Sequence, residues 1–228
     1  MRTARTIASI NQDDEFVFLL EDLDASGYRR RCQSLDPSGA ELVLNWLAAF
    51  HATFLFRKPE GLWPVGTYWH LATRPDEFEA MDDQSTLKAR AQQIDNELQQ
   101  CRFQTIVHGD AKVANFCFTP GIDSVAAVDF QYVGGGCGMK DVAYFLGSCM
   151  GEQQLEDHAD SLLDYYFEIL KKHIPGADDA RELEEEWRVL YPLAWADFER
   201  FLEGWCPDHH KRHGYTRQMT EVALSTLG

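Results

Sequence analysis

A segment near the middle of the chain constrains the fold most, because short apolar runs alternate there with polar loops. Residues 103–107 (Phe-Gln-Thr-Ile-Val) predict a short buried strand. Residues 115–118 and 124–128 predict two more strands, separated by a turn with the sequence Pro-Gly at its centre. Asp110, Asn115 and Asp129 lie at or beside the ends of these strands. We therefore expect their side chains to meet at the mouth of one small β structure.

The spacing of these polar residues fits phosphoryl transfer. Asp110 and Asn115 have the D-x-x-x-x-N spacing in which the Asp faces an acceptor hydroxyl. The Asn then holds Mg²⁺ together with a later Asp, here Asp129, and such a site leaves room for water and phosphate oxygens. Lys112 can bring a positive charge to a phosphate oxygen. The structural alternative is that Asp110 and Asn115 cap a turn and that Asp129 ends a strand.

The motif H-G-D-x-x-x-x-N at residues 108–115, followed by D-F-Q at residues 129–131, resembles the aminoglycoside phosphotransferase and choline kinase-like enzymes, which have a protein-kinase-like fold. The D-F-Q variant is most similar to the ecdysteroid kinase-like branch. The resemblance implies an ATP- and Mg²⁺-dependent phosphorylation of a hydroxyl on a small molecule. Asp110 would then be the catalytic base, and Asn115 with Asp129 would hold the metal, while Lys112 would help neutralise the transferring group.

Two further features follow from the resemblance. In the family, a strand that ends in Leu-Glu-Asp-Leu is the hinge whose backbone binds adenine, and the apolar strand at residues 16–20 is followed here by Glu21, Asp22 and Leu23. These three would be the cofactor-binding residues, and the alternative is a plain strand before an acidic turn. An Asp placed after the metal-binding Asp anchors the catalytic loop in the family. We expect Asp141 to have this role, and His108 to support the site with it.

The expected fold class is α+β: the large, C-terminal lobe of a protein-kinase-like fold, mostly helical, with a small β unit that carries the catalytic loop. We predict one domain over residues 1–228. If residues 16–23 are the hinge, the Gly-rich phosphate loop and the lysine of the small lobe have no counterpart before it. The run at residues 134–138 is rich in glycine but follows the metal-binding Asp, and we interpret it as a flexible turn. A second hypothesis therefore stands: a non-catalytic or truncated kinase-like module with a binding or regulatory role.

Hydrophobic periodicity predicts helices over most of the remaining chain. The expected helices cover residues 38–56, with a Ser38/Glu41 capping box, and residues 76–100, 140–150, 152–173 and 177–205, with a kink or break at Pro192. Residues 1–12 show little pattern and are expected to be partly ordered.

Aromatic residues and histidines near the C-terminus allow two interpretations each. The aromatic stripe within residues 183–205 is typical of core packing, and the alternative is an aromatic box that binds a cationic acceptor with Asp197 or Glu199. The cluster of His209, His210 and His213 is interpreted as part of a solvated tail rather than a metal site.

Composition narrows the range of partners. The net charge of −16 argues against nucleic acid and anionic membranes, since both require a basic surface. Six scattered cysteines without a C-x-x-C pair, and an N-terminus without an apolar core, predict reduced thiols in a cytoplasmic protein. The expected partner is a small-molecule acceptor, which the sequence does not identify. An uncovered hinge strand would favour pairing with a second copy of the chain, as a homo-oligomer.

Overall fold

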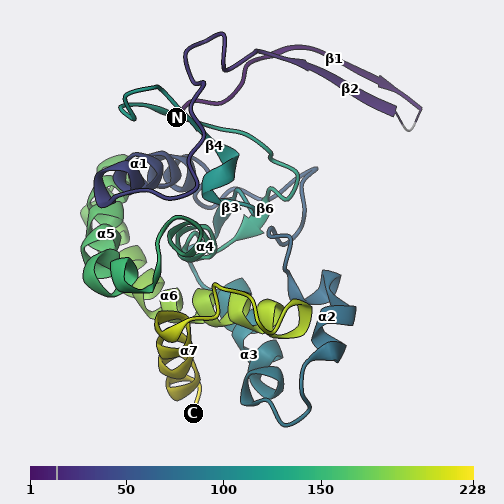
Figure 1. The fold of residues 1–228 in the computed structure, drawn as a ribbon, viewed down its shortest axis with the longest axis vertical. Helices are drawn as coiled ribbons and strands as arrows, with labels where there is room; N and C mark the ends of the chain where they lie inside the picture. Colours follow the sequence, from purple (N-terminus) through teal and green to yellow (C-terminus); the bar gives the residue numbers. More distant parts are fainter. Residues whose placement is uncertain (14) are drawn as a thin grey trace.

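The computed structural model describes residues 1–13 and 15–228. Pairs of short antiparallel strands lie among helices (Figure 1). The strands are β1 (Thr6–Gln12), β2 (Glu15–Leu20), β3 (Thr105–Val107), β4 (Phe116–Phe118), β5 (Val125–Ala127) and β6 (Gly134–Gly136). The helices are α1 (Pro37–Thr53), α2 (Pro75–Ala80), α3 (Thr86–Gln100), α4 (Met139–Cys149), α5 (Glu152–His173), α6 (Ala177–Trp205) and α7 (Gly214–Thr226), with 3₁₀ turns η1 (Leu71–Thr73) and η2 (Val113–Asn115).

The predicted α+β class, mostly helical with a small β part, is confirmed. Helix α1 lies against α5, while α2, α3, α4 and α7 all contact α6. Helix α1 begins as expected at a proline, but its cap differs from the prediction. The Asp36 side chain accepts a hydrogen bond of 2.8 Å from the Gly39 backbone, and Ser38 donates to the same carboxylate oxygen. The predicted Ser38/Glu41 capping box does not form.

Helix α6 runs unbroken through Pro192, so the helix does not break there, and of the two predicted alternatives only a kink remains. Proline in a helix interior costs about 3 kcal/mol. Its neighbours Leu190, Tyr191 and Leu193 are all buried, and burial of this apolar face offsets that cost. The core interpretation of the aromatic stripe is confirmed for Trp187 and Trp195 as well as for the two phenylalanines between Trp195 and Trp205.

The helix predicted over residues 76–100 is two helices, α2 and α3. The segment between them contains Ser85, whose hydroxyl accepts a hydrogen bond from the Lys88 backbone and starts α3. Met81 is buried at the break. A local serine cap thus ends a pattern that the spacing of apolar residues alone suggested was continuous.

The glycine-rich run is a buried strand and not the flexible turn predicted for it. Gly134 to Gly136 form β6, which pairs with β3 in the register Val107↔Gly134 and Thr105↔Gly136. A Cβ atom on Gly134 would lie 2.8 Å from the Trp63 Cβ and would overlap the Trp63 carbonyl oxygen. Glycine is therefore required here by close backbone packing.

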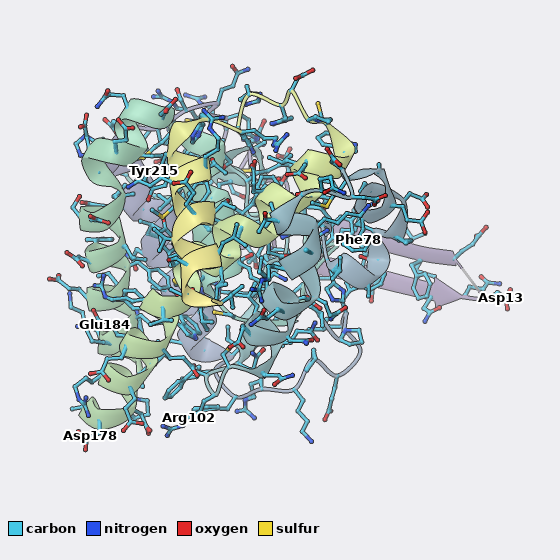
Figure 2. All side chains as sticks on the ribbon, turned by 90° about the horizontal axis from the view of Figure 1, so that it is seen from below. Asp13, Phe78, Arg102, Asp178, Glu184 and Tyr215 are labelled. Atoms are coloured by element: carbon cyan, nitrogen blue, oxygen red, sulfur yellow. The ribbon has the colours of Figure 1, made fainter. Side chains whose placement is uncertain are left out.

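The β1–β2 hairpin corrects the prediction for residues 1–12, because Thr6–Gln12 is a regular strand. It pairs with β2 in the register Ile10↔Val17, with an irregularity between Thr6 and Ala8. All residues of both strands are exposed. The hairpin extends away from the helices, with Asp13 near its tip (Figure 2).

Candidate active site

The loop after β3 is held by one buried carboxylate. Asp141, at the start of α4, accepts hydrogen bonds from the backbone N–H groups of His108, at 2.6 Å, and Gly109, at 3.0 Å. The Nε2 atom of His51 on α1 donates to the same carboxylate at 3.0 Å. Burial opposes ionisation of Asp141, but the His51 hydrogen bond and the loop N–H groups hold its pKa below the ordinary value.

His51 is the buried, hydrogen-bonded histidine that fixes Asp141. Because its Nε2 faces a carboxylate, this nitrogen donates, and the neutral ring accepts at Nδ1 from the Tyr166 hydroxyl, 2.7 Å away. The His51 backbone carbonyl also accepts from the Thr105 hydroxyl on β3. Helices α1, α4 and α5 are thus tied to the strand that precedes the catalytic loop.

His108 connects the two halves of the β unit. Its Nε2 lies 3.0 Å from the carbonyl oxygen of Val128, which can only accept, so Nε2 donates. Its Nδ1 accepts from the backbone N–H of Asp110. Both ring nitrogens are therefore engaged in holding backbone. Gly109 adopts φ +78°, and a Cβ atom there would lie 2.8 Å from the Thr67 nitrogen and overlap the Tyr132 carbonyl oxygen, so only glycine fits.

Asp110 is nearly buried, with 4% of its surface exposed, and three side chains contact its carboxylate. Oδ2 accepts from the Lys112 ammonium at 2.8 Å and from the Asn115 amide at 2.9 Å. The Tyr144 hydroxyl lies 3.3 Å from Oδ1. The charge of Lys112 thus balances the charge of Asp110, while Oδ1 has the longer and weaker contact to Tyr144.

Asn115 is oriented by Asp110. Its amide nitrogen donates to both the backbone carbonyl and the carboxylate of Asp110, at 2.8 and 2.9 Å. Because both of these partners are acceptors, the amide nitrogen must face them. The Asn115 carbonyl oxygen consequently points away from Asp110, and no donor contacts it among residues 1–13 and 15–228.

Asp129 follows directly on the segment that touches Asn115. The Val128 N–H donates to the backbone carbonyl of Asn115, not to its side chain, at 3.0 Å, and the Val128 carbonyl accepts from His108. Asp129 itself is exposed and has φ +64°, a conformation that Asp adopts more readily than most residues. In the described part of the chain, its carboxylate makes neither an ion pair nor a hydrogen bond.

The predicted hinge residues lie next to this unit but have other local partners. Leu23 is buried against Cys117 of β4 and Ala126 of β5. Glu21 pairs with Arg2 at 2.5 Å, and this hydrogen bond is the main reason that its pKa is lowered to about 2. The Asp22 carboxylate accepts from two backbone N–H groups of the following turn. The side chains of Glu21 and Asp22 therefore stabilise the turn. The backbone is partly engaged as well, because the Glu21 N–H donates to the Arg5 carbonyl and the Asp22 and Leu23 carbonyls accept from Ser26 and Tyr28. The N–H groups of Asp22 and Leu23 make no hydrogen bond in the described residues and remain candidates for base recognition.

Three residues near Asp110 were missed by the sequence analysis. Tyr144 and Tyr68 approach one another with hydroxyl groups 3.3 Å apart, and burial raises the pKa of Tyr68 to about 12. Lys211 places its ammonium 4.9 Å from the centre of the Tyr144 ring. Burial lowers its pKa to about 8, although the charge of Asp110 acts in the opposite direction. Only the apolar face of α4 could have pointed to Tyr144.

The C-terminal histidines do not form the solvated tail predicted for them. They lie in the loop between α6 and α7, where the His213 ring caps α7 by accepting from the Thr216 backbone. No group of three His, Cys, Asp or Glu side chains in the described residues is arranged to hold a metal ion. Asp197 is also unavailable to a cationic acceptor, since it is buried and accepts from the Trp69 indole at 2.9 Å while it pairs with Arg200.

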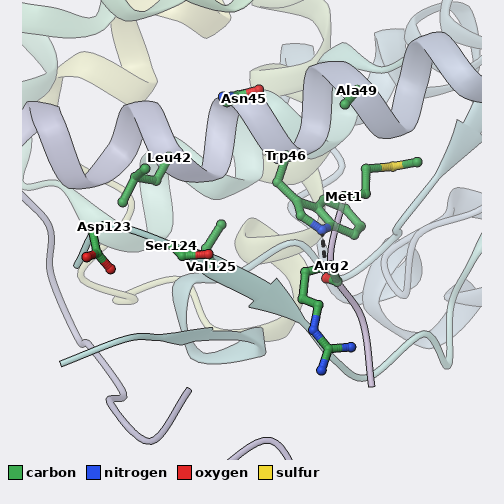
Figure 3. Close-up of a pocket in the computed structure, with 9 residues that line it drawn as sticks. All are labelled: Met1, Arg2, Leu42, Asn45, Trp46, Ala49, Asp123, Ser124 and Val125. Atoms are coloured by element: carbon green, nitrogen blue, oxygen red, sulfur yellow. Dashed lines mark hydrogen bonds between the residues drawn. The ribbon is translucent and has the colours of Figure 1, made fainter. Parts of the chain in front are cut away.

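A separate hollow of about 340 Å³ lies between α1 and β5 (Figure 3). The Trp46 indole at its wall donates to the Arg2 carbonyl at 2.9 Å. None of the residues predicted for catalysis, nucleotide binding or metal binding lines it. We therefore place the candidate active site at the catalytic loop and not in this hollow.

Comparison with known families supports this placement. The family model described as ecdysteroid kinase-like matches residues 67–176, which include β3, the catalytic loop, Asp129 and Asp141. This central segment is similar to the ecdysteroid kinase-like family. The resemblance inferred from the two motifs is thus confirmed. No curated protein sequence matches the chain.

Solved structures with the same fold include several small-molecule kinases. A protein of Ralstonia eutropha JMP134 with the provisional name aminoglycoside phosphotransferase has a TM-score of 0.57 and 15% identity, over 98% of this chain and 75% of its own. An amicoumacin kinase solved with AMP-PNP, Ca²⁺ and Ami has a TM-score of 0.55 and 13% identity, over 100% of this chain and 72% of its own. An ethanolamine kinase of Plasmodium vivax has a TM-score of 0.54 and 14% identity, over 99% of this chain and 67% of its own. At these identities the likeness shows the protein-kinase-like fold.

The predicted site residues fall into two groups in the structure. Asp110, Lys112 and Asn115 are in direct contact, and His108 and Asp141 hold their backbone. The remaining predicted residues, from the hinge and at position 129, adjoin this group through the β4–β5 pair.

None of the helices in the described residues has the length and apolar character needed to cross a bilayer.

Proposed function

We propose that the chain is an ATP- and Mg²⁺-dependent phosphotransferase that acts on a hydroxyl group of a small molecule. The observation that carries the proposal is the contact between Asp110, Lys112 and Asn115 on a loop fixed by Asp141. Phosphoryl transfer depends mainly on positioning and charge stabilisation, and this loop supplies both.

The proposed role of Asp110 is to orient the acceptor hydroxyl and to accept its proton. Within the described residues, its carboxylate oxygen Oδ1 has one contact, at 3.3 Å to the Tyr144 hydroxyl, and this oxygen would be the one that faces the acceptor hydroxyl. Lys112 lies 2.8 Å from the other oxygen and would place its positive charge beside the transferring group.

The proposed metal ligands fit Mg²⁺ by their chemistry. The side-chain oxygen Oδ1 of Asn115 and the carboxylate of Asp129 have no donors in the described residues, and Mg²⁺ prefers one or two protein oxygens of this kind. A bound ion would neutralise phosphate charge at this place. The segment Glu21–Leu23 would contact the adenine through the backbone N–H groups of Asp22 and Leu23. The Glu21 and Asp22 side chains are already engaged, and so are the Glu21 N–H and the Asp22 and Leu23 carbonyls.

The acceptor class is suggested by the fold relatives named for ethanolamine and aminopropanol. We therefore propose a small molecule that carries a hydroxyl group. We also expect a cytoplasmic location, in agreement with six free thiols.

The test measures Mg-ATP hydrolysis and the thermal shift caused by Mg-ATP on the chain as given. Asp110→Asn should lower turnover by about 10²-fold or more while it keeps the Mg-nucleotide shift. Asp129→Asn should abolish the part of the shift that depends on Mg²⁺. The matched control is Asp178→Asn, an exposed aspartate at the start of α6 (Figure 2).

Two results would count against the proposal. Full activity of the Asp110 variant would remove this residue from catalysis. Nucleotide binding without any turnover would favour the second hypothesis, a kinase-like binding module, which the exposed β1–β2 hairpin also favours.

A further inference from the structure

One face of helix α4 contacts the catalytic loop at three points. Asp141 accepts from the backbone N–H groups at the start of the loop, and the Ser148 hydroxyl accepts at 2.8 Å from the Val113 N–H near its end. Tyr144 lies between them, about one helical turn from each, so its side chain projects from the same face. Its hydroxyl meets the carboxylate of Asp110 and not the loop backbone. Helix α4 therefore holds both the path of the loop and the side chain proposed as the base.

The ring of Tyr144 is fixed by its neighbours. The residue is 4% exposed, and the ring centres of Trp69 and Phe198 each lie 4.8 Å from its own. The Lys211 ammonium lies 4.9 Å from the same ring. Because packed side chains hold the ring, the position of its hydroxyl is set before any ligand binds.

The Tyr144 hydroxyl has two oxygen neighbours but one proton. Oδ1 of Asp110 and the hydroxyl oxygen of Tyr68 each lie 3.3 Å from it. An ionised carboxylate can only accept, and it binds a proton donor more strongly than a neutral hydroxyl does. Burial raises the pKa of both tyrosines, so both hydroxyls keep their protons. The donors therefore run in one direction, from Tyr68 to Tyr144 and from Tyr144 to Asp110.

This chain completes the support of the Asp110 carboxylate. Its Oδ2 atom accepts from Lys112 at 2.8 Å and from Asn115 at 2.9 Å, and Tyr144 is the contact of Oδ1 within the described residues. A carboxylate oxygen can accept two hydrogen bonds, so Oδ1 keeps one position for an acceptor hydroxyl. The 3.3 Å contacts are long, as catalytic hydrogen bonds often are before a substrate binds.

We propose that Tyr144, supported by Tyr68, is a positioning residue for phosphoryl transfer, and that its hydroxyl directs Oδ1 of Asp110 toward the acceptor hydroxyl. The proposal rests on the proposed kinase function and deepens it by naming residues that act through the base. A base must lie within hydrogen-bond reach of the proton that it accepts, and a small misplacement lowers the rate. The alternative is a purely structural hydroxyl, whose loss would lower turnover by the same factor whatever residue stands at position 110.

The experiment removes each hydroxyl and keeps the ring. Tyr144→Phe should lower kcat for Mg-ATP hydrolysis roughly tenfold and leave KM for Mg-ATP and the Mg-ATP thermal shift unchanged. Tyr68→Phe should lower kcat about threefold, because Tyr144 still contacts Oδ1. Tyr191→Phe is the matched control: this buried tyrosine of α6 has a hydroxyl without a partner in the described residues, and its kcat should equal that of the wild type. Thermal melting shows that each variant is folded.

A double-mutant cycle separates positioning from a structural role. In an Asp110→Ala background no carboxylate is left to direct, so Tyr144→Phe should lower the residual hydrolysis by less than about twofold. A similar loss in both backgrounds would overturn the proposal, and so would wild-type kcat in a folded Tyr144→Phe protein. A raised KM for Mg-ATP at unchanged kcat would place Tyr144 in nucleotide binding and would overturn it as well.

Urea unfolding tests the same contact without reference to activity. Tyr144→Phe and Asp110→Ala remove the same hydrogen bond, so the midpoint should fall less in the double variant than the two single losses added together. Strictly additive losses would overturn the proposal. If Asp110→Asn loses turnover and Tyr144→Phe does not, only this inference falls. If Asp110→Asn keeps full turnover, or the wild-type chain has none, the proposed kinase function falls and this inference falls with it.

Discussion

The molecule has long strands that are exposed and short strands that are buried, and this difference shows that a strand's length does not decide how firmly it is held. Strands β1 and β2 have seven and six residues, and every one of them is exposed. Strands β3 and β4 have three residues each, and all of these are buried. A two-stranded hairpin alone is marginally stable in water. The catalytic loop is therefore fixed by burial and by side chains that bind its backbone, not by the length of its strands.

Asp141 is the strongest test of that difference. Replacing Asp141 by Ala removes the acceptor for two loop N–H groups and for His51, and it should lower the free energy of unfolding by about 3–5 kcal/mol. Urea denaturation measures the loss. The exposed Asp178, changed to Ala, should cost less than about 0.5 kcal/mol. Equal effects of the two variants would show that the loop is held by something other than this carboxylate.

Gly134 tests whether the short strands depend on close packing. Gly134→Ala should destabilise the protein by about 1–3 kcal/mol, because the new methyl group would collide with Trp63. Gly151→Ala is the control, since a Cβ atom there would meet nothing within 4 Å and its φ is −82°. A melting temperature unchanged by Gly134→Ala would mean that β6 can move away from Trp63.

Acid titration compares a fully buried carboxylate, Asp141, with a half-buried one, Glu21. The pKa of Asp141 is lowered in the folded state, so the unfolded chain binds its proton first as the pH falls. The stability that Asp141 contributes is therefore complete above about pH 5 and is lost as the pH falls through its unfolded value, near 4, toward its folded pKa. Asp141→Ala should flatten this acid limb in urea titrations.

Glu21, at the base of the hairpin, serves as the comparison in that titration. Its pKa is also lowered, to about 2, chiefly by its hydrogen bond with Arg2. Solvent still reaches this half-buried pair and screens it, so Glu21→Gln should change the acid limb less than Asp141→Ala does. A larger effect from Glu21 than from Asp141 would reverse the comparison between the two regions.

The contact between Asp110 and Asn115 could be predicted from the sequence because its information is local. The apolar runs before and after residues 108–115 define the strands, and the motif itself places Asp110 beside Asn115. The role of Asp141 followed from the resemblance and agrees with the contacts that the structure shows. Helix α5 was also predicted within its observed limits, since its apolar stripe is regular and Pro175-Gly176 follows it.

The parts that were missed depend on contacts between distant residues. A run of glycines carries no periodicity, so pairing of β6 with β3 could not be seen before Trp63 was known to pack against it. The loop of Lys211 was interpreted as a tail because its histidines have no helical spacing. Its place beside Tyr144 arises from the packing of α7 on α6, which no local pattern records.

Substitutions in the β1–β2 hairpin should have the smallest effect on the free energy of unfolding and the largest effect on association between copies of the chain. By the observed register, Val17 and Leu19 share one face with Ala8 and Ile10, so this face is entirely apolar near the middle of the hairpin. The double variant Val17→Thr, Leu19→Thr should change the free energy of unfolding by less than about 0.5 kcal/mol, because both side chains are already exposed.

The same variant should weaken self-association, measured by sedimentation over a range of protein concentrations, if the hairpin pairs two copies through this face. Phe16→Ser lies on the opposite face, across from Asn11, and should weaken association less. An identical loss from both variants would indicate pairing through the strand edge instead. If the wild-type chain stays monomeric at all concentrations tested, the hairpin does not pair two copies of the chain. The exposed hairpin would then differ from the buried strands only in its stability.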